Sequence, residues 1–246
     1  MKFVGVDFGW VSGASGLCCL QFQKEKLEII DITIETELEA VLSWLDSWVK
    51  PKESAIVAVD APTVIPNQTG TRIPDKLSHK YFGKYHAGCY PANLNRPFAI
   101  RTVGFSKSLE TRGFIHGDTI TAQKPGRYQI EVFPHPAIVH LFDRDRILKY
   151  KKGKLIEKKR ELKRLRKYLV DILPQLNPAL NLDLDKIPKI ANNLTGRQLK
   201  IVEDKLDSII CAYVAAYWWY WGKERNIVLG DKSTGYIVVP NRIERE

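Results

Sequence analysis

Cysteine is scarce in this chain, and its spacing matches no redox or metal-binding motif. The four cysteines are the adjacent Cys18 and Cys19 and the isolated Cys89 and Cys211. Because no Cys-x-x-Cys pair occurs, the sequence offers neither a structural zinc site nor a thioredoxin-like dithiol. We therefore expect reduced thiols and a cytoplasmic protein.

Long apolar runs are lacking too. The longest, residues 209–221, is shorter than the roughly 20 residues that a helix needs to cross a bilayer. Only four apolar or small residues separate Lys2 from Asp7, which is too few for the apolar region of a secretory signal. The sequence therefore predicts no membrane partner, and residues 209–221 are expected to form a buried helix.

Acidic residues are fewer than basic ones, and the imbalance is local. The net charge is +10, and residues 144–167 alone hold 13 of the 38 Lys and Arg but only 3 of the 28 Asp and Glu. The rest of the chain is therefore electrically balanced. A basic patch confined to one segment is the footprint of a polyanion-binding surface.

Residues 144–173 are predicted to be a basic helical segment. Leucines recur within it at helical spacing, which predicts a helix over residues 155–173 with an apolar stripe beneath a Lys and Arg face. The substrate contacts expected on that face are Lys158, Lys159, Lys163 and Arg166. The alternatives are a solvated face or contact with anionic lipid, and the stripe lacks the Trp or Phe of a membrane-surface helix.

Apolar residues make up 44% and aromatic residues 10% of the 246 residues, enough for the core of a single domain over residues 1–246. The predicted strands are residues 2–7, 14–22, 27–34, 55–60, 127–133 and 236–240, and the predicted helices are residues 36–49, 136–142, 155–173 and 197–222. Residues 63–126 are expected to be a loop-rich insertion or active-site loop region. The order predicts an α/β fold with a mixed sheet, antiparallel in its first three strands and then parallel, flanked by helices. This pattern resembles the ribonuclease H-like fold.

Two apolar runs each end on a lone aspartate. Residues 3–6 lead into Asp7, and residues 55–59 lead into Asp60. A carboxylate at the end of a buried run is costly to desolvate unless a cation meets it. If the two strands are neighbours, Asp7 and Asp60 lie side by side at one sheet edge, which is an arrangement typical of a divalent-metal site.

Three further acids complete the candidate site. Glu131 lies in a later predicted strand, and Asp204 and Asp207 lie three residues apart, on one face of the long helix. Oxygen ligands without His or Cys favour Mg²⁺ or Mn²⁺. We expect catalytic metal ligands at Asp7, Asp60, Glu131 and Asp207, with Asp204 as a further ligand. The alternative for each acid is an ordinary solvent-exposed position.

Several short motifs, taken in order, resemble a known family. They are Gly5-Val6-Asp7-Phe8-Gly9-Trp10, Val59-Asp60-Ala61-Pro62, Arg72-Ile73-Pro74-Asp75, Glu131-Val132-Phe133-Pro134, Asp204-Lys205-Leu206-Asp207-Ser208 and Gly235-Tyr236-Ile237-Val238-Val239-Pro240. Together they look like the domain-of-unknown-function family 429, which is described as predicted ribonuclease H-like nucleases. The resemblance covers nearly the whole chain and implies that fold, with a carboxylate site at Asp7, Asp60, Glu131 and Asp204 or Asp207. It implies no particular substrate.

The acidic site and the basic segment point to the same substrate. Two metal ions held by carboxylates activate a water and stabilise the leaving oxygen in a phosphoryl displacement. A basic helix would hold the phosphate backbone. We therefore expect a metal-dependent nuclease acting on DNA or RNA, with Arg72 and Arg96 as further phosphate contacts.

Two other functions stay open. A nucleic-acid-binding protein without catalysis would use the basic helix alone. An ATP-dependent phosphotransferase of the actin-like superfamily would use residues 5–9 as a first phosphate loop, although only Gly230 and Gly235 are available for a second. His135 is expected to be a structural turn residue, with proton transfer as the alternative.

Overall fold

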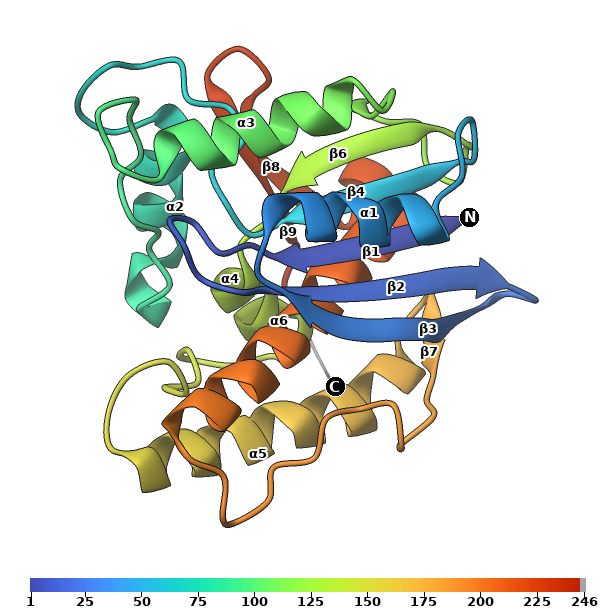
Figure 1. Cartoon of the computed structure of the whole chain (residues 1–246), viewed down its shortest axis with the longest axis vertical. Helices are drawn as coiled ribbons and strands as arrows, with labels where there is room; N and C mark the ends of the chain where they lie inside the picture. Colours follow the sequence, from blue (N-terminus) through green and yellow to red (C-terminus); the bar gives the residue numbers. More distant parts are fainter. Residues whose placement is uncertain (244–246) are drawn as a thin grey trace.

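The computed structural model describes residues 1–243, and a seven-stranded mixed sheet runs through its centre (Figure 1). Its strands, in the order β5-β6-β4-β1-β2-β3-β7, are β5 (Ile115–His116), β6 (Arg127–Glu131), β4 (Ala55–Val59), β1 (Lys2–Asp7), β2 (Ser15–Gln23), β3 (Lys26–Glu35) and β7 (Ala179–Asn181). β1, β2 and β3 pair antiparallel, whereas β4 and β6 follow β1 in parallel. The predicted mixed sheet, antiparallel and then parallel, is confirmed.

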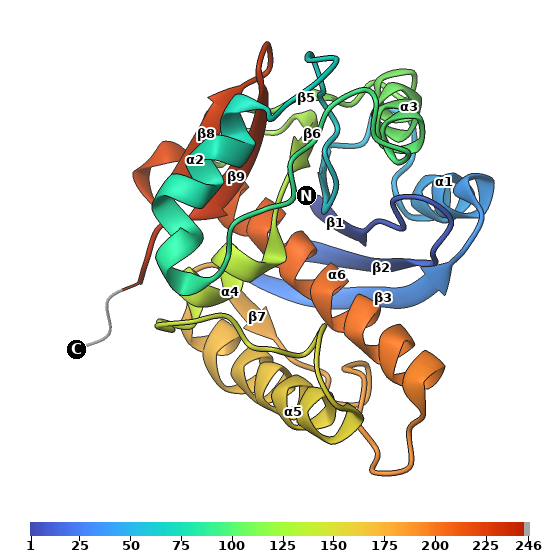
Figure 2. The same ribbon diagram turned by 90° about the vertical axis from the view of Figure 1, so that its left-hand side faces the viewer.

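Helices cover both faces of the sheet (Figure 2). One face packs against α1 (Leu38–Trp48) and α3 (Ala99–Glu110), and the other against α4 (Pro134–Leu141), α5 (Leu155–Ile172) and α6 (Gly196–Trp221). Side chains alternate between the faces along each strand. Val4 and Val6 therefore join the core under α1 and α3, while Phe3 joins the core under α6.

Two glycines let α6 lie directly on the sheet. A Cβ on Gly5 would be 2.0 Å from the carbonyl oxygen of Ser208, and a Cβ on Gly16 would be 2.1 Å from that of Asp204. Any side chain at either glycine would therefore push the helix away. Close packing fixes the height and register of α6 above β1 and β2. The predicted buried helix over residues 209–221 is confirmed as the apolar part of α6.

The region at 63–126 is less irregular than its composition predicts. It contains α2 (Ile73–Phe82), a short 3-10 helix (Gly83–Tyr85), α3 and β5. Its loops are stabilised by polar contacts instead of a periodic apolar pattern. Asn67 and Asn93, for example, donate side-chain hydrogen bonds to the carbonyl oxygens of Thr69 and Gly70.

Two strands beyond β6 have no counterpart among the predicted elements. β7 lies where a connector is expected and pairs with β3 over only three residues, between the 3-10 helix Leu173–Gln175 and α6. After a third 3-10 helix (Gly222–Glu224), β8 (Asn226–Asp231) and β9 (Gly235–Pro240) form a separate antiparallel pair. Among residues 1–243, none of the helices combines the length and apolar character that crossing a bilayer requires.

Candidate functional site

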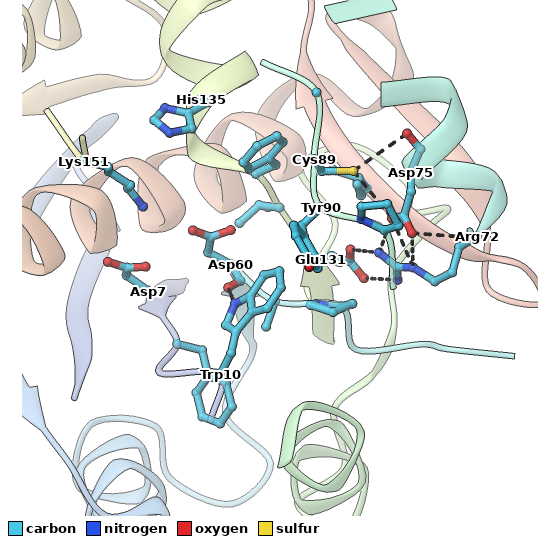
Figure 3. Close-up of a pocket in the computed structure, with 18 of the residues that line it drawn as sticks. Asp7, Trp10, Asp60, Arg72, Asp75, Cys89, Tyr90, Glu131, His135 and Lys151 are labelled. Atoms are coloured by element: carbon cyan, nitrogen blue, oxygen red, sulfur yellow. Dashed lines mark hydrogen bonds and ion pairs between the residues drawn. The ribbon is translucent and has the colours of Figure 1, made fainter. Parts of the chain in front are cut away.

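Asp7 and Asp60 end neighbouring parallel strands. Val6 pairs with Val59, and the Asp60 N–H donates to the Val6 carbonyl oxygen at 2.8 Å. Phe3 and Ile56 face α6, so Asp7 and Asp60, at even spacing from them, face α6 as well. Both carboxylates point into one space (Figure 3). The predicted juxtaposition of these two aspartates is present in the structure.

α6 brings Asp204 and Asp207 to the same place. Gly16 is the cross-strand partner of Asp7, and the backbone of Asp204 lies against it. Asp207 follows almost one turn later, next to Ser208, which lies over Gly5. Both aspartates interact electrostatically with Asp7. We call Asp7, Asp60, Asp204 and Asp207 the acidic cluster.

Two lysines supply positive charge to the acidic cluster. Lys151 Nζ lies 2.8 Å from Asp207 Oδ2, and the Tyr150 hydroxyl donates to Asp207 Oδ1 at 2.8 Å. Lys200 Nζ lies 2.5 Å from Asp204 Oδ1. In Figure 3 the Lys151 side chain points toward Asp7 and Asp60. The only cations that meet these carboxylates within residues 1–243 are therefore flexible lysine side chains.

The two lysines do not satisfy the whole cluster. Asp7 Oδ2 and Asp207 Oδ2 are buried and accept no hydrogen bond from residues 1–243, and the contact of Asp207 Oδ2 with Lys151 is ionic only. A proton on the Asp204 carboxyl gives Asp7 a hydrogen bond, because the two carboxyls are neighbours. Such a proton relieves the repulsion between buried carboxylates.

The pKa values of the aspartates in the acidic cluster and of Lys151 also indicate a shortage of positive charge. Burial, followed by the charge of Asp7, raises the pKa of Asp204 to about 8. Burial also raises the pKa of Asp7 and of Asp60, and Lys151 offsets this only in part. Burial by itself would lower the pKa of Lys151, but the neighbouring carboxylates of Asp207 and Asp7 raise it. The acidic cluster therefore favours the binding of additional positive charge.

A cavity of about 710 Å³ opens onto the cluster; we call it the acidic cavity. Asp7 and Asp60 line it together with Lys151 and Lys200, whereas Asp204 and Asp207 lie behind them and do not. Its apolar walls include Phe8, Trp10, Tyr90 and Phe133. The cavity thus combines carboxylates, ammonium groups and aromatic surfaces.

Glu131 borders this cavity but does not join the acidic cluster. Arg72 binds both of its oxygens, with Nη2 at 2.7 Å from Oε1 and Nη1 at 2.9 Å from Oε2. The Thr63 N–H donates to Oε2 at 3.0 Å. Both carboxylate oxygens of Glu131 are therefore already paired. This pairing differs from the free carboxylate expected of a catalytic metal ligand, and a role for Glu131 as a ligand stays a prediction.

Glu131 points away from Asp7 and Asp60 because its strand position differs from theirs by one residue of register. Glu131 pairs with Val59, which faces α1 and α3, and not with Asp60. A shift of one residue along a strand turns a side chain to the opposite face of the sheet. The position of a carboxylate near the end of a strand does not reveal this offset, so the sequence alone placed Glu131 with Asp7 and Asp60.

Arg72 is likewise occupied by protein groups. It is buried, binds Asp75 as well as Glu131, and donates to the Val64 carbonyl oxygen at 2.9 Å. Burial opposes its charge, but Glu131 and Asp75 raise its pKa. Arg72 therefore acts as an internal counter-ion, and its role as a phosphate contact stays a prediction. We call Arg72, Asp75 and Glu131 the arginine network.

The remaining predicted substrate contacts lie outside the acidic cavity. Lys159 and Lys163 donate to Asn192, and Arg166 donates to the Pro188 carbonyl oxygen. These three residues fasten α5 to the segment before α6. Lys158 lies on the same helix. Arg96 lies over the Tyr90 ring, 5.3 Å from its centroid, at the edge of the cavity.

His135, expected as a structural turn residue, lines the acidic cavity. Burial, with a further contribution from Lys151, lowers its pKa to about 4, so its imidazole is neutral at pH 7. Its Nδ1 is buried and has no hydrogen-bond partner among residues 1–243. Lys151 was not predicted to face the acidic cluster, because the density of lysines marks residues 144–167 but does not indicate which lysine faces the aspartates. Lys200 lies outside that segment, four residues before Asp204 on α6, at a spacing that favours a helical ion pair.

The donor set suits Mg²⁺ or Mn²⁺. No three Asp, Glu, His or Cys side chains of residues 1–243 are arranged as a ready metal-binding group. Mg²⁺, however, commonly binds through one or two carboxylates and completes its coordination with water and substrate phosphates. Asp7 and Asp60 offer two carboxylates to the acidic cavity, and one buried oxygen of Asp7 lacks a partner. These residues fit such an ion.

Comparison with protein families identifies the family of this chain. The family model described as "Protein of unknown function (DUF429)" matches residues 5–233. This agrees with the resemblance seen in the motifs. The chain matches no curated protein.

Proposed function

We propose that this chain, which belongs to the DUF429 family, is a metal-dependent nuclease that hydrolyses phosphodiester bonds of nucleic acid. The sheet order supports a ribonuclease H-like fold as the scaffold, with the acidic cluster at the ends of β1 and β4. The four free cysteines suit a reducing, cytoplasmic setting.

One observation carries the proposal. The Asp7 carboxylate is buried in a cluster of four aspartates, and no N–H group or ammonium of residues 1–243 donates a hydrogen bond to its Oδ2. A buried carboxylate left in this way is costly, so it takes up either a proton or a cation. The cavity in front of it admits a hydrated cation and a phosphate group together.

Asp7 and Asp60 would hold the ion from the cavity wall, with Asp207 behind them. A divalent cation bound there lowers the pKa of water and stabilises negative charge on phosphoryl oxygens. Asp204 stands next to Asp7 as a further carboxyl that releases its proton when positive charge arrives.

The other cavity residues have separate roles in this proposal. Lys151 and Lys200 present ammonium groups that pair with phosphate oxygens once a cation neutralises the aspartates. His135, neutral at pH 7, can accept a proton at Nδ1. Phe8 and Trp10 provide apolar walls against which a base or sugar packs, and they exclude water from the site.

Cleavage of defined substrates tests the proposal. Labelled single-stranded, duplex, hybrid and branched DNA and RNA would be incubated with Mg²⁺ or Mn²⁺, with EDTA as the blank. We expect metal-dependent cleavage of at least one substrate by the wild type, and none by Asp7→Asn, which should still bind that substrate. If the wild type cleaves nothing, or Asp7→Asn cleaves equally well, the mechanism is wrong. Salt-dependent binding without cleavage would instead favour a non-catalytic nucleic-acid-binding protein.

A further inference from the structure

A second cavity of about 510 Å³ adjoins the acidic cavity; we call it the basic cavity. Its charged lining residues are Arg146, Lys149, Lys152, Glu157, Arg160 and Glu161. Lys152 also lines the acidic cavity, so the two cavities are neighbours that share one side chain. A ligand bound in the first therefore lies beside the second.

The segment before α5 forms the wall between the two cavities. Leu148 and Tyr150 are buried and anchor it, with 2% and 0% of their surface exposed. Lys149 and Lys151 point in opposite directions: Lys149 lines the basic cavity, and Lys151 lines the acidic cavity. The segment ends at Gly153, whose φ of +108° turns the chain into α5. Its two buried side chains thus hold this segment, which we call the strap, with lysines on two opposite sides.

The positive charge of the basic cavity is not balanced by its own carboxylates. Glu161 forms ion pairs with Arg160 and Arg164. Glu157 accepts the backbone N–H of Lys154 at the start of α5 and keeps its negative charge, so four cations face two carboxylates in this lining. The partial positive charge of that helix terminus acts in the same direction as the lysines.

Three of the cations that line the basic cavity have no ion-pair partner among residues 1–243. Within the part of the chain that the structure describes, Arg146, Lys149 and Lys152 form no ion pair with any carboxylate. The net positive charge of this hollow favours the entry of an anion. An Arg with two Lys at such a site is suited to the oxygens of a phosphate group.

We propose that the basic cavity binds a second phosphate of the nucleic-acid substrate, adjacent to the phosphate that enters the acidic cavity. This inference rests on the proposed function for its substrate class. It places the substrate-positioning residues at Arg146, Lys149 and Lys152, and not on the outer face of α5. The bound phosphate is either a terminal monophosphate or an internal phosphodiester of the strand.

Binding measured without metal tests this separately from catalysis. Fluorescence anisotropy in EDTA would follow short labelled DNA and RNA oligonucleotides, each with and without a terminal phosphate, over a series of salt concentrations. The test variant is Arg146→Gln/Lys149→Gln/Lys152→Gln. The matched control, Lys24→Gln/Lys26→Gln/Lys52→Gln, removes the same charge from exposed positions around the β2–β3 turn and before β4.

We expect the test variant to weaken binding about tenfold and to reduce the slope of log K against log salt by about 1, as loss of one phosphate contact does. The control should change affinity by about twofold or less, as expected for general electrostatics at exposed positions. If the wild type prefers the terminal phosphate and the test variant loses that preference, the ligand is a monophosphate. Equal losses with both kinds of oligonucleotide identify an internal phosphodiester.

The inference is overturned if the test variant and the control bind like the wild type, if the two variants lose equal affinity, or if the wild type binds no oligonucleotide. Because no step of this experiment needs cleavage, loss of binding in the test variant supports the basic cavity even where the cleavage assay fails. Conversely, cleavage by the wild type with unchanged binding by the test variant would keep the nuclease proposal and remove this one.

Discussion

Two groups of carboxylates border the acidic cavity, and they differ in what pairs with them. In the arginine network, Glu131 receives two bonds from one guanidinium and a third from a backbone N–H. In the acidic cluster, Asp7 has a buried oxygen without a donor, and Lys151 touches Asp207 from a side chain that remains 29% exposed. Both groups are buried, and each includes a carboxylate at the end of a central strand.

The difference separates a structural role from a binding role. A rigid, bidentate guanidinium satisfies a carboxylate permanently, whereas an ammonium on a flexible stem can leave. The arginine network therefore holds α2 against β6, and the acidic cluster is left able to accept a cation. Glu131 pairs with Val59, one residue before Asp60, and this offset places its carboxylate in the arginine network instead of the acidic cluster.

Breaking the arginine network should have the largest effect on stability. Arg72→Leu leaves Glu131 and Asp75 buried without their counter-ion, which should cost about 3–5 kcal/mol of unfolding free energy. Urea denaturation followed by circular dichroism measures the loss. The matched control is Arg112→Leu, which removes an exposed pair with Asp46 and should cost about 1 kcal/mol or less. If both variants lose the same unfolding free energy, the arginine network has no special structural role.

Removing one aspartate of the acidic cluster should act on metal binding instead. Loss of groups that only orient a ligand costs about 10–100-fold in metal affinity, so loss of a direct ligand in Asp60→Asn should reach about 100-fold. Calorimetric titration with Mn²⁺ gives the value. Glu131→Gln, once shown to be folded, should change the affinity by far less. A larger loss of Mn²⁺ affinity in Glu131→Gln than in Asp60→Asn would mean that the arginine network, and not the acidic cluster, binds the metal.

Removing the resident ammonium should strengthen metal binding. Lys151→Met takes away the cation that competes for Asp207 and Asp7, so the Mn²⁺ affinity should rise about tenfold, or about 1.4 kcal/mol. Thermal unfolding with and without Mn²⁺ should show a larger stabilisation in this variant than in the wild type. Lys149→Met, on the same strap but facing the basic cavity, is the control. Weaker metal binding in Lys151→Met would show that this lysine assists the ion.

The last prediction concerns pH, where the effect is spread over several pH units. The Asp204 carboxyl keeps its proton in the folded protein up to about pH 8, whereas an unfolded aspartate loses it near pH 4. The folded state therefore binds the extra proton in that window, and metal-free stability falls as pH rises, by up to about 1.4 kcal/mol per pH unit. Thermal unfolding in EDTA from pH 5 to pH 9 should show a shallower decline in Asp204→Asn. An unchanged slope would mean that another group holds the proton.

Much of the fold follows from local patterns in the sequence. The β2–β3 hairpin, α1, α5 and α6 have alternating or helical apolar spacing, and the structure has them within a few residues of the predicted bounds. β7 escapes prediction because it pairs over only three residues, with a strand that is distant in the sequence. β8 pairs with β9, the next strand in the chain, so this hairpin is a local feature that the prediction missed.

The candidate site was predictable in part, for a related reason. Asp7 and Asp60 interrupt apolar runs, and Asp204 and Asp207 share a helix face, so local spacing brings out all four. The pairing of Glu131 with Arg72 depends on strand register, and the contact of Lys151 with Asp207 depends on how a loop packs against α6. The pair between Lys200 and Asp204 follows from helical spacing. Charge density marked residues 144–167 but could not separate the lysines that fasten α5 from those that face a cavity.

A crystal structure of the protein grown with Mn²⁺, with anomalous scattering used to locate the ion, would show directly whether the acidic cluster binds a cation. We expect an anomalous peak beside the carboxylates of Asp7 and Asp60, with Lys151 moved away from Asp207 and the contacts between Arg72 and Glu131 unchanged. A peak bound to Glu131, or no peak at the acidic cluster while Lys151 remains paired with Asp207, would contradict this expectation.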